Sequence, residues 1–163
     1  MLKPHFIINT ITDITVDFLR ENNIEVLLLD VDNTLSVAHK NKTLRSGVKE
    51  WLERIQKSGI KLIVLSNAKA KRAKAFAKSI GLDAVGLAAK PLPFGYLKAV
   101  KNLNESKRTT AVVGDQIFTD VFGGRLAGIK TILVTDITPE QTLSFKIRRK
   151  IEQKLRKRWG NGR

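Results

Sequence analysis

The residues most able to do chemistry in this sequence come directly after short apolar runs. Asp30 and Asp32 lie two residues apart behind the run 26–29, and Asp115 and Asp120 follow a later run. Paired carboxylates can serve as nucleophile, as general acid and base, or as ligands of a shared divalent cation. Each pair taken alone is equally consistent with an ordinary turn or helix cap, because Asp favours both. The chemistry must therefore be judged from what the fold places beside these pairs.

Two further polar positions follow apolar runs in the same way. Ser66 and Asn67 come after the run 62–65, and Lys90 comes after the run 84–88. A hydroxyl at the start of a helix and a lysine ammonium both suit the oxygens of a phosphoryl group. Alone, Ser66 is more simply a helix N-cap, and Lys90 is more simply a solvated surface lysine.

Strand-length apolar runs alternate with helical patterns along most of the chain. The expected strands cover 26–29, 62–65, 84–88, 111–113 and 131–134. The expected helices cover 15–22, 48–55, 73–80, 97–103, 121–126 and a C-terminal stretch that begins at Thr138. This alternation predicts an α/β fold with a five-stranded parallel sheet, in which right-handed crossovers bring all strand C-terminal ends to one edge. Open α/β sheets bind their ligands at that edge.

Four consecutive strand-to-helix junctions would thus deliver polar groups to a single site. The set comprises two pairs of carboxylates, one hydroxyl and one ammonium. Four carboxylates close together repel one another, and a hard divalent cation removes that repulsion. Oxygen ligands without His or Cys point to Mg²⁺. The hydroxyl and the ammonium then suit a phosphoryl group, and a carboxylate facing its phosphorus can form an aspartyl-phosphate.

The order of these motifs is similar to that of a known superfamily. The sequence has DVDNTL at 30–35, Ser-Asn at 66–67, Lys-Pro at 90–91 and GDQIFTD at 114–120. With these four motifs the chain resembles the haloacid dehalogenase-like (HAD) phosphohydrolases from residue 26 to about residue 135. In detail it most resembles the YqeG family of subfamily IIIA. The resemblance implies a three-layer, Rossmann-like α/β fold.

The resemblance also implies a role for each site residue. Asp30 is the expected nucleophile, and Asp32 is the expected general acid that protonates the leaving oxygen and then the base that activates water. Ser66, Asn67 and Lys90 are expected to hold the phosphoryl oxygens. The implied activity is hydrolysis of a phosphomonoester through an aspartyl-phosphate intermediate.

A Mg²⁺ cofactor belongs to the same implication. The expected ligands are the carboxylates of Asp30 and Asp115 and the backbone carbonyl of Asp32. Asp120 would order either the water shell of the metal or Lys90. All four Asp residues are therefore predicted to belong to the metal site.

A cap domain, which members of this superfamily often carry, has no room in this chain. Only 34 residues separate Asp32 from Ser66, and only 24 separate Ser66 from Lys90. One helix, one strand and a short flap at 36–45 fill the first interval, and one helix and one strand fill the second. We therefore expect an uncapped site, suited to a substrate that brings its own cover: a lipid headgroup, a nucleic-acid end or a protein.

The positive charge is concentrated at the C-terminus. The chain has 30 Lys and Arg against 15 Asp and Glu, a net charge of +15. Residues 144–163 hold nine basic residues and one Glu, a net +8, so we divide the chain into a phosphatase domain at 1–143 and a basic amphipathic tail at 144–163. Apolar residues recur every fourth position along this tail: Leu143, Ile147, Ile151, Leu155 and Trp159. The tail packs on the domain with its basic face in solvent, lies on an anionic membrane surface, or binds the phosphate backbone of a nucleic acid.

Composition limits the other classes of protein. The chain has no Cys, which excludes disulfides, thiolate metal sites and a cysteine nucleophile. None of its apolar runs approaches the length of a membrane span. We expect a cytoplasmic protein, and whether it attaches peripherally to the inner face of the membrane is left open.

Three functions remain in competition. The YqeG family is similar to phosphatidylglycerophosphate phosphatases, so the resemblance implies removal of phosphate from that lipid at the membrane surface. The second function is a phosphatase of nucleic-acid ends or nucleotides, which an aromatic content of only 6% disfavours because such proteins stack bases on aromatic side chains. The third is a non-enzymatic protein associated with RNA or the ribosome, and the intact motifs argue against it.

Overall fold

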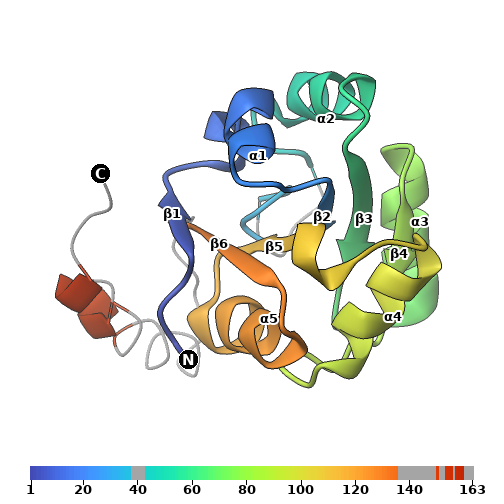
Figure 1. The fold of residues 1–163 in the computed structure, drawn as a ribbon. Coiled ribbons are helices and arrows are strands. Elements are labelled where there is room, and N and C mark those ends of the chain that lie inside the picture. The colour runs from blue at the N-terminus through green and yellow to red at the C-terminus, as the bar shows by residue number, and fades with distance from the viewer. Residues whose placement is uncertain (38–42, 136–149, 151–152, 156, 160–163) are drawn as a thin grey trace.

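A six-stranded, wholly parallel sheet organises the fold (Figure 1). The computed structural model describes residues 1–37, 43–135, 150, 153–155 and 157–159, and its strands lie in the order β1-β6-β5-β2-β3-β4. Their bounds are β1 Phe6–Ile8, β2 Val26–Leu29, β3 Lys61–Leu65, β4 Asp83–Val85, β5 Thr110–Gly114 and β6 Lys130–Val134. β4 ends earlier than predicted, because Leu87 and Ala89 adopt left-handed φ angles of 49° and 53° that a strand cannot contain.

The sheet has one strand more than the five predicted, because no pattern in the sequence indicates β1. This strand pairs with β6, with Phe6 opposite Ile132 and Ile8 opposite Val134. It is three residues long, half-buried and at the edge of the sheet. A run this short shows no periodicity that distinguishes it from a loop, and its pairing partner comes from the far end of the domain.

Helices cover both faces of the sheet, which gives the three layers expected from the family resemblance. α1 Val16–Glu21, α2 Val48–Lys57 and α3 Ala70–Ser79 pack on one face, and α4 Phe94–Asn102 and α5 Phe122–Ala127 pack on the other (Figure 1). The short turns are η1 Ile11–Asp13, η2 Lys107–Thr109 and the π-helical η3 Ile117–Val121. The helices predicted over 15–22, 48–55, 73–80 and 97–103 are confirmed, and the helix predicted over 121–126 is divided between η3 and α5. The predicted helix start at Thr138 lies outside the described residues.

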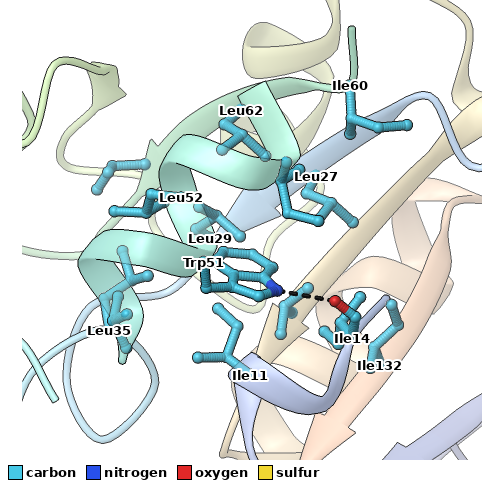
Figure 2. Close-up of a cluster of buried hydrophobic side chains, with 14 of the residues drawn as sticks. Ile11, Ile14, Leu27, Leu29, Leu35, Trp51, Leu52, Ile60, Leu62 and Ile132 are labelled. Carbon is cyan, nitrogen blue, oxygen red and sulfur yellow. Dashed lines mark hydrogen bonds between the residues drawn. The ribbon is translucent and has the colours of Figure 1, made fainter. Parts of the chain in front are cut away.

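The central strands are buried on both faces, as their continuous apolar runs predict. Successive residues of β2 point to opposite sides, so that Leu27 joins the core under α1, α2 and α3 while Leu28 joins the core under α4 and α5. In the first core the Trp51 indole N–H donates to the Ile14 carbonyl at 2.8 Å (Figure 2). This packing fixes β2, the strand that leads into Asp30.

The described residues contain no cap domain. α2 and β3 occupy the interval between Asp32 and Ser66, and α3 and β4 occupy the interval between Ser66 and Lys90. The expectation of an uncapped fold is confirmed for this part of the chain.

The C-terminal tail is described only in part. Leu155 and Trp159 pack against a small cluster formed by Ile117, Val121 and Leu133. The other members of the predicted apolar stripe, Leu143, Ile147 and Ile151, lie outside the described residues. In the described parts of the chain, no helix combines the length and the apolar character that crossing a membrane requires.

Candidate active site

Four loops at the carboxyl edge of the sheet meet around one pocket. β2 leads into Asp30, β3 into Ser66, the loop after β4 into Lys90, and β5 into Asp115 and Asp120. The pocket has a volume of about 470 Å³, and its lining includes Asp30, Asp32, Ser66, Asn67 and Lys90. The junctions that the alternating pattern predicted to converge are thus brought together by the fold.

A buried lysine links two of the carboxylates. Lys90 Nζ donates to Asp30 Oδ1 at 2.5 Å and to Asp120 Oδ1 at 2.7 Å. Burial raises the pKa of Asp30 well above its usual value; Lys90 opposes this shift, and Asp120 and Asp115 add to it. Burial acts to lower the pKa of Lys90, but the negative charges of Asp120 and Asp30 outweigh it and raise the pKa of this lysine. Lys90 is therefore a fixed cation among acidic groups.

Asp30, Asp115 and Asp120 form a buried cluster with the dimensions of a metal site. One carboxylate oxygen from each lies within 4.8 Å of the others. Asn33 Nδ2 donates to Asp115 Oδ2 at 3.4 Å, whereas Asp30 Oδ2 is buried with no hydrogen-bond partner in the described part of the chain. A buried carboxylate oxygen without a donor is costly unless a cation contacts it. This all-oxygen set fits Mg²⁺, and the Asp32 side chain is not part of it.

The turn that carries Asp30 and Asp32 is closed by local hydrogen bonds. The Asn33 N–H donates to the Ser36 carbonyl at 2.9 Å, and Asn33 has a left-handed φ of 62°, which Asn tolerates better than most residues. Arg45 Nη1 donates to the Asn33 carbonyl at 2.9 Å. The turn buries Asp30 and leaves Asp32 exposed at the pocket wall. Two neighbouring carboxylates thus have the different environments that separate catalytic roles require.

Gly114 allows Asp120 to approach the end of β5. A Cβ atom at Gly114 would lie 2.2 Å from Asp120 Cγ, which is shorter than any side chain permits. The Gln116 N–H donates to Asp120 Oδ2 at 3.1 Å, and the Tyr96 hydroxyl donates to the Thr119 carbonyl at 2.6 Å. These contacts hold η3 so that the other carboxylate oxygen of Asp120 meets Lys90.

The Asn67 side chain contacts the backbone of Lys90 on both sides. The Lys90 N–H donates to Asn67 Oδ1 at 2.7 Å, and Asn67 Nδ2 donates to the Lys90 carbonyl at 3.1 Å. Beside it, Ser66 Oγ accepts from the Ala68 N–H at 3.1 Å, as a residue at a helix start commonly does. Asn67 therefore positions Lys90, and direct contact of Asn67 with a phosphoryl group stays a prediction.

Some pocket residues were not predicted from the sequence. The pocket lining also includes Arg72, Phe76, Gln116, Phe118 and Thr119. Gln116, Phe118 and Thr119 lie inside the fourth motif, which was the available signal for them. Arg72 belongs to a stretch at the start of α3 that has several basic residues and no acidic one, so its charge was visible in the sequence but its place at the pocket was not.

Comparisons with known proteins agree with this geometry. A model of the haloacid dehalogenase-like hydrolase family matches residues 11–128. The chain is 32% identical over 159 residues to the "Probable phosphatase YqeG" of Bacillus subtilis (strain 168), which covers 95% of this chain and 92% of that protein.

Solved structures with a similar fold include two proteins named as phosphatases. A 4-nitrophenylphosphatase from Thermotoga maritima matches with a TM-score of 0.59 at 16% identity, covering 78% of this chain and 91% of that one. A 3-deoxy-D-manno-octulosonate 8-phosphate phosphatase from Yersinia pestis matches with a TM-score of 0.56 at 19% identity, covering 77% and 72%. At these identities the likeness establishes the fold alone.

Proposed function

This chain belongs to the haloacid dehalogenase-like hydrolases, in the family of the phosphatase YqeG, and from that membership we propose that it hydrolyses a phosphomonoester through an aspartyl-phosphate on Asp30 with Mg²⁺ bound beside it. The family resemblance and the assignment as a phosphatase are confirmed. The observation that carries the mechanistic proposal is the buried contact of Lys90 with Asp30 and Asp120 at a pocket that Asp32 also lines.

Asp30 accepts the phosphoryl group, and Asp32 transfers the protons. In the first step a carboxylate oxygen of Asp30 bonds to the phosphorus, the ester P–O bond breaks, and Asp32 gives a proton to the leaving oxygen. In the second step Asp32 takes a proton from a water molecule whose oxygen attacks the phosphorus. The acyl-phosphate P–O bond then breaks, which releases inorganic phosphate and restores the Asp30 carboxylate. The exposure of Asp32 suits a group that must give and then take a proton.

The remaining polar groups hold the phosphoryl oxygens. Lys90 and Ser66 are the proposed direct contacts, and Asn67 supports them by fixing the Lys90 backbone. Groups that are already fixed stabilise developing charge without reorganising during the reaction.

The proposed Mg²⁺ ligands are the carboxylates of Asp30 and Asp115 and the backbone carbonyl of Asp32, with Asp120 ordering the surroundings through Lys90. When bound, the cation would withdraw negative charge from the phosphoryl oxygens. The unpartnered Asp30 Oδ2 and the spacing of the buried carboxylates support this assignment.

The proposed substrate is phosphatidylglycerophosphate, the lipid that the family resemblance implies. Support comes from the uncapped pocket, because no domain of the described chain closes over a small metabolite. A lipid headgroup projects from a surface and needs no enclosure. The strong positive charge of the chain also favours an anionic substrate surface.

Substrate preference is the first test. With Mg²⁺, we expect the purified protein to hydrolyse phosphatidylglycerophosphate in mixed micelles with a kcat/KM at least about tenfold above that for 3′- or 5′-phosphorylated oligonucleotides, a difference of about 1.4 kcal/mol. Phosphate release is the measurement, and a chelator-treated sample that regains activity with Mg²⁺ is the control. Faster hydrolysis of the oligonucleotides would support the nucleic-acid function instead. No release from the lipid, the oligonucleotides or an aryl phosphate would overturn the mechanism.

The C-terminal tail is proposed to add an electrostatic contact with anionic lipid. In its described part Leu155 and Trp159 face the domain, whereas Lys154, Lys157 and Arg158 are exposed. Charged side chains near an anionic membrane each contribute roughly 1 kcal/mol, and salt screens them.

Charge-reversal substitutions test this contact and leave the packing of Leu155 and Trp159 against the domain unchanged. We expect Lys154→Glu/Lys157→Glu/Arg158→Glu to weaken binding to phosphatidylglycerol vesicles at low salt by more than about tenfold, and the difference to shrink at high salt. Co-sedimentation with the vesicles measures this. Equal binding of the wild-type and triple-variant proteins at low salt would remove the tail from the membrane contact.

A further inference from the structure

The segment 87–97, which contains Lys90, has several large apolar side chains that are exposed to solvent. Leu87, Leu92 and Phe94 are 65%, 51% and 69% exposed, and Leu97 in α4 is 38% exposed. We call these four residues the apolar rim. The other large apolar side chains with comparable exposure in the described residues are scattered along the chain: Met1, Val37 and Leu126. Exposed apolar side chains that gather in one place mark a contact surface, whereas single ones are ordinary.

The backbone conformation of an anchored loop keeps the Leu87 side chain in solvent. Leu87 has a φ of 49°, which is uncommon for a residue with a bulky side chain, and its N–H donates to the Ala68 carbonyl at 2.8 Å. A Cβ atom at Gly86 would lie only 2.6 Å from Ala70 Cα, so this loop is pressed against the start of α3. Backbone strain of this kind persists where a site requires it. The exposure of Leu87 is therefore a property of an anchored loop.

The helix that follows contributes to the same surface. The sequence pattern over 97–103 predicts a helix marked by Leu97, Val100 and Leu103, and that helix forms. However, α4 buries Tyr96, Ala99 and Val100 against the sheet and leaves Leu97 exposed. Phe94 and Leu97 lie three residues apart and so on the same side of α4.

The chain on both sides of the apolar rim is rich in basic residues. From residue 66 to residue 104 the chain has one acidic residue, Asp83, at the first position of β4 and hence at the opposite edge of the sheet from the pocket. The basic residues of this stretch are Lys69, Lys71, Arg72, Lys74, Lys78, Lys90, Lys98 and Lys101. All except Lys90 are exposed, and Arg72 also lines the pocket. α3 and α4 both contact β4 (Figure 1), and Gly86, in the loop after β4, packs against Ala70 at the start of α3, so basic residues of α3 lie beside the loop that begins the apolar rim.

We propose that the apolar rim and the exposed basic residues of α3 dock this enzyme on an anionic lipid surface, with Leu92 and Phe94 entering the headgroup region. An anionic lipid surface satisfies both features, because it offers apolar depth beneath negative charge. A single-stranded nucleic acid would meet mostly leucines, which do not stack bases. A second copy of this chain would bring two basic surfaces together. The proposal deepens the proposed function by supplying its docking surface, and it rests on that function only for the substrate.

Apolar-to-polar substitution in the rim is the direct test. We expect Leu92→Gln/Phe94→Gln to bind mixed phosphatidylcholine–phosphatidylglycerol vesicles about tenfold or more weakly than the wild-type protein in a flotation assay, at high as well as low salt. Hydrolysis of a soluble aryl phosphate should be unchanged, because neither residue lines the pocket. Leu126→Gln is the matched control, since Leu126 is 41% exposed on α5 and outside the rim. Vesicle binding by the double variant equal to that of the wild-type protein would overturn the proposal.

A spectroscopic variant tests insertion independently of affinity. In a Trp159→Phe background, where the remaining native Trp51 is fully buried, Phe94→Trp should shift its fluorescence to the blue when anionic vesicles are added. No shift under conditions where the protein floats with the vesicles would contradict insertion at this position. Light scattering without vesicles measures whether the protein is a dimer. If the wild-type protein is a dimer, and the Leu92→Gln/Phe94→Gln variant is a monomer that still binds vesicles, then the rim is an interface with a second copy of this chain.

The docking proposal and the substrate proposal are tested by different assays, so either can be wrong without the other. Vesicle binding and the fluorescence shift require no catalysis, so they test the docking surface even if phosphatidylglycerophosphate is not the substrate. Hydrolysis in mixed micelles requires no docking on a bilayer, so it tests the substrate even if the rim plays no part.

Discussion

Replacing Asp30 with Asn is expected to reduce hydrolysis of an aryl phosphate by on the order of 10³-fold or more, because an amide oxygen cannot form the aspartyl-phosphate. The substitution keeps the shape of the side chain and leaves an oxygen that can still accept from Lys90. The fold should therefore persist while kcat falls. Initial rates with saturating Mg²⁺ measure the effect.

Asp83→Asn provides the matched control for this loss. Asp83 is exposed at the first position of β4, away from the pocket, so the same chemical change there should leave the rate unchanged. Retention of more than a tenth of wild-type kcat by Asp30→Asn, at unaltered folding, would contradict the assignment of Asp30 as nucleophile. A loss of the same size in Asp83→Asn would attribute the effect to charge in general.

Replacing Lys90 with Met is expected to destabilise the fold at neutral pH by roughly 3–5 kcal/mol, because the buried carboxylates of Asp30 and Asp120 both lose the ammonium group with which they pair. The penalty should shrink as the pH falls. Burial already raises the pKa of Asp30, and without the opposing lysine its folded-state pKa rises further above the unfolded value. Protonation then neutralises the folded state first, so stability recovers on the acid side of neutrality.

Urea unfolding at pH 7 and pH 5 measures this effect, with Lys101→Met as a control because Lys101 is exposed on α4. Added Mg²⁺ should restore part of the stability of Lys90→Met, since a cation bound by the folded state alone shifts the unfolding equilibrium. An unfolding midpoint for Lys90→Met equal to that of the wild-type protein at pH 7 would contradict the view that Lys90 neutralises the cluster.

The placement of the candidate site was predictable because each polar group is a neighbour in sequence of the strand that positions it. Asp30 follows β2 and Asp115 follows β5, and the parallel topology alone brings such junctions to one edge. The buried runs of the central strands were equally clear, because both faces of those strands are apolar. The roles of the residues came from the family resemblance and from chemistry, not from spacing.

The features that could not be predicted depend on contacts between distant segments. Asn67 meets the Lys90 backbone only because two loops approach in space, and its residue type gives no sign of that partner. β1 exists because β6 lies beside it. In α4, helical spacing alone could not tell that Tyr96 turns inward and Leu97 outward, since both are apolar enough for a core position.

The strand order has a consequence for how the protein is made. β2, which ends at Asp30, pairs with β3 on one side and with β5 on the other, and β5 is synthesised much later than β2. A nascent chain therefore holds one edge of β2 unpaired until Thr110–Gly114 has left the ribosome. Such non-local pairing slows folding and leaves an unpaired, aggregation-prone strand edge until β5 is available. Catalysis can begin only once β5 has paired with β2, so the appearance of activity during synthesis would report the insertion of β5 into the sheet.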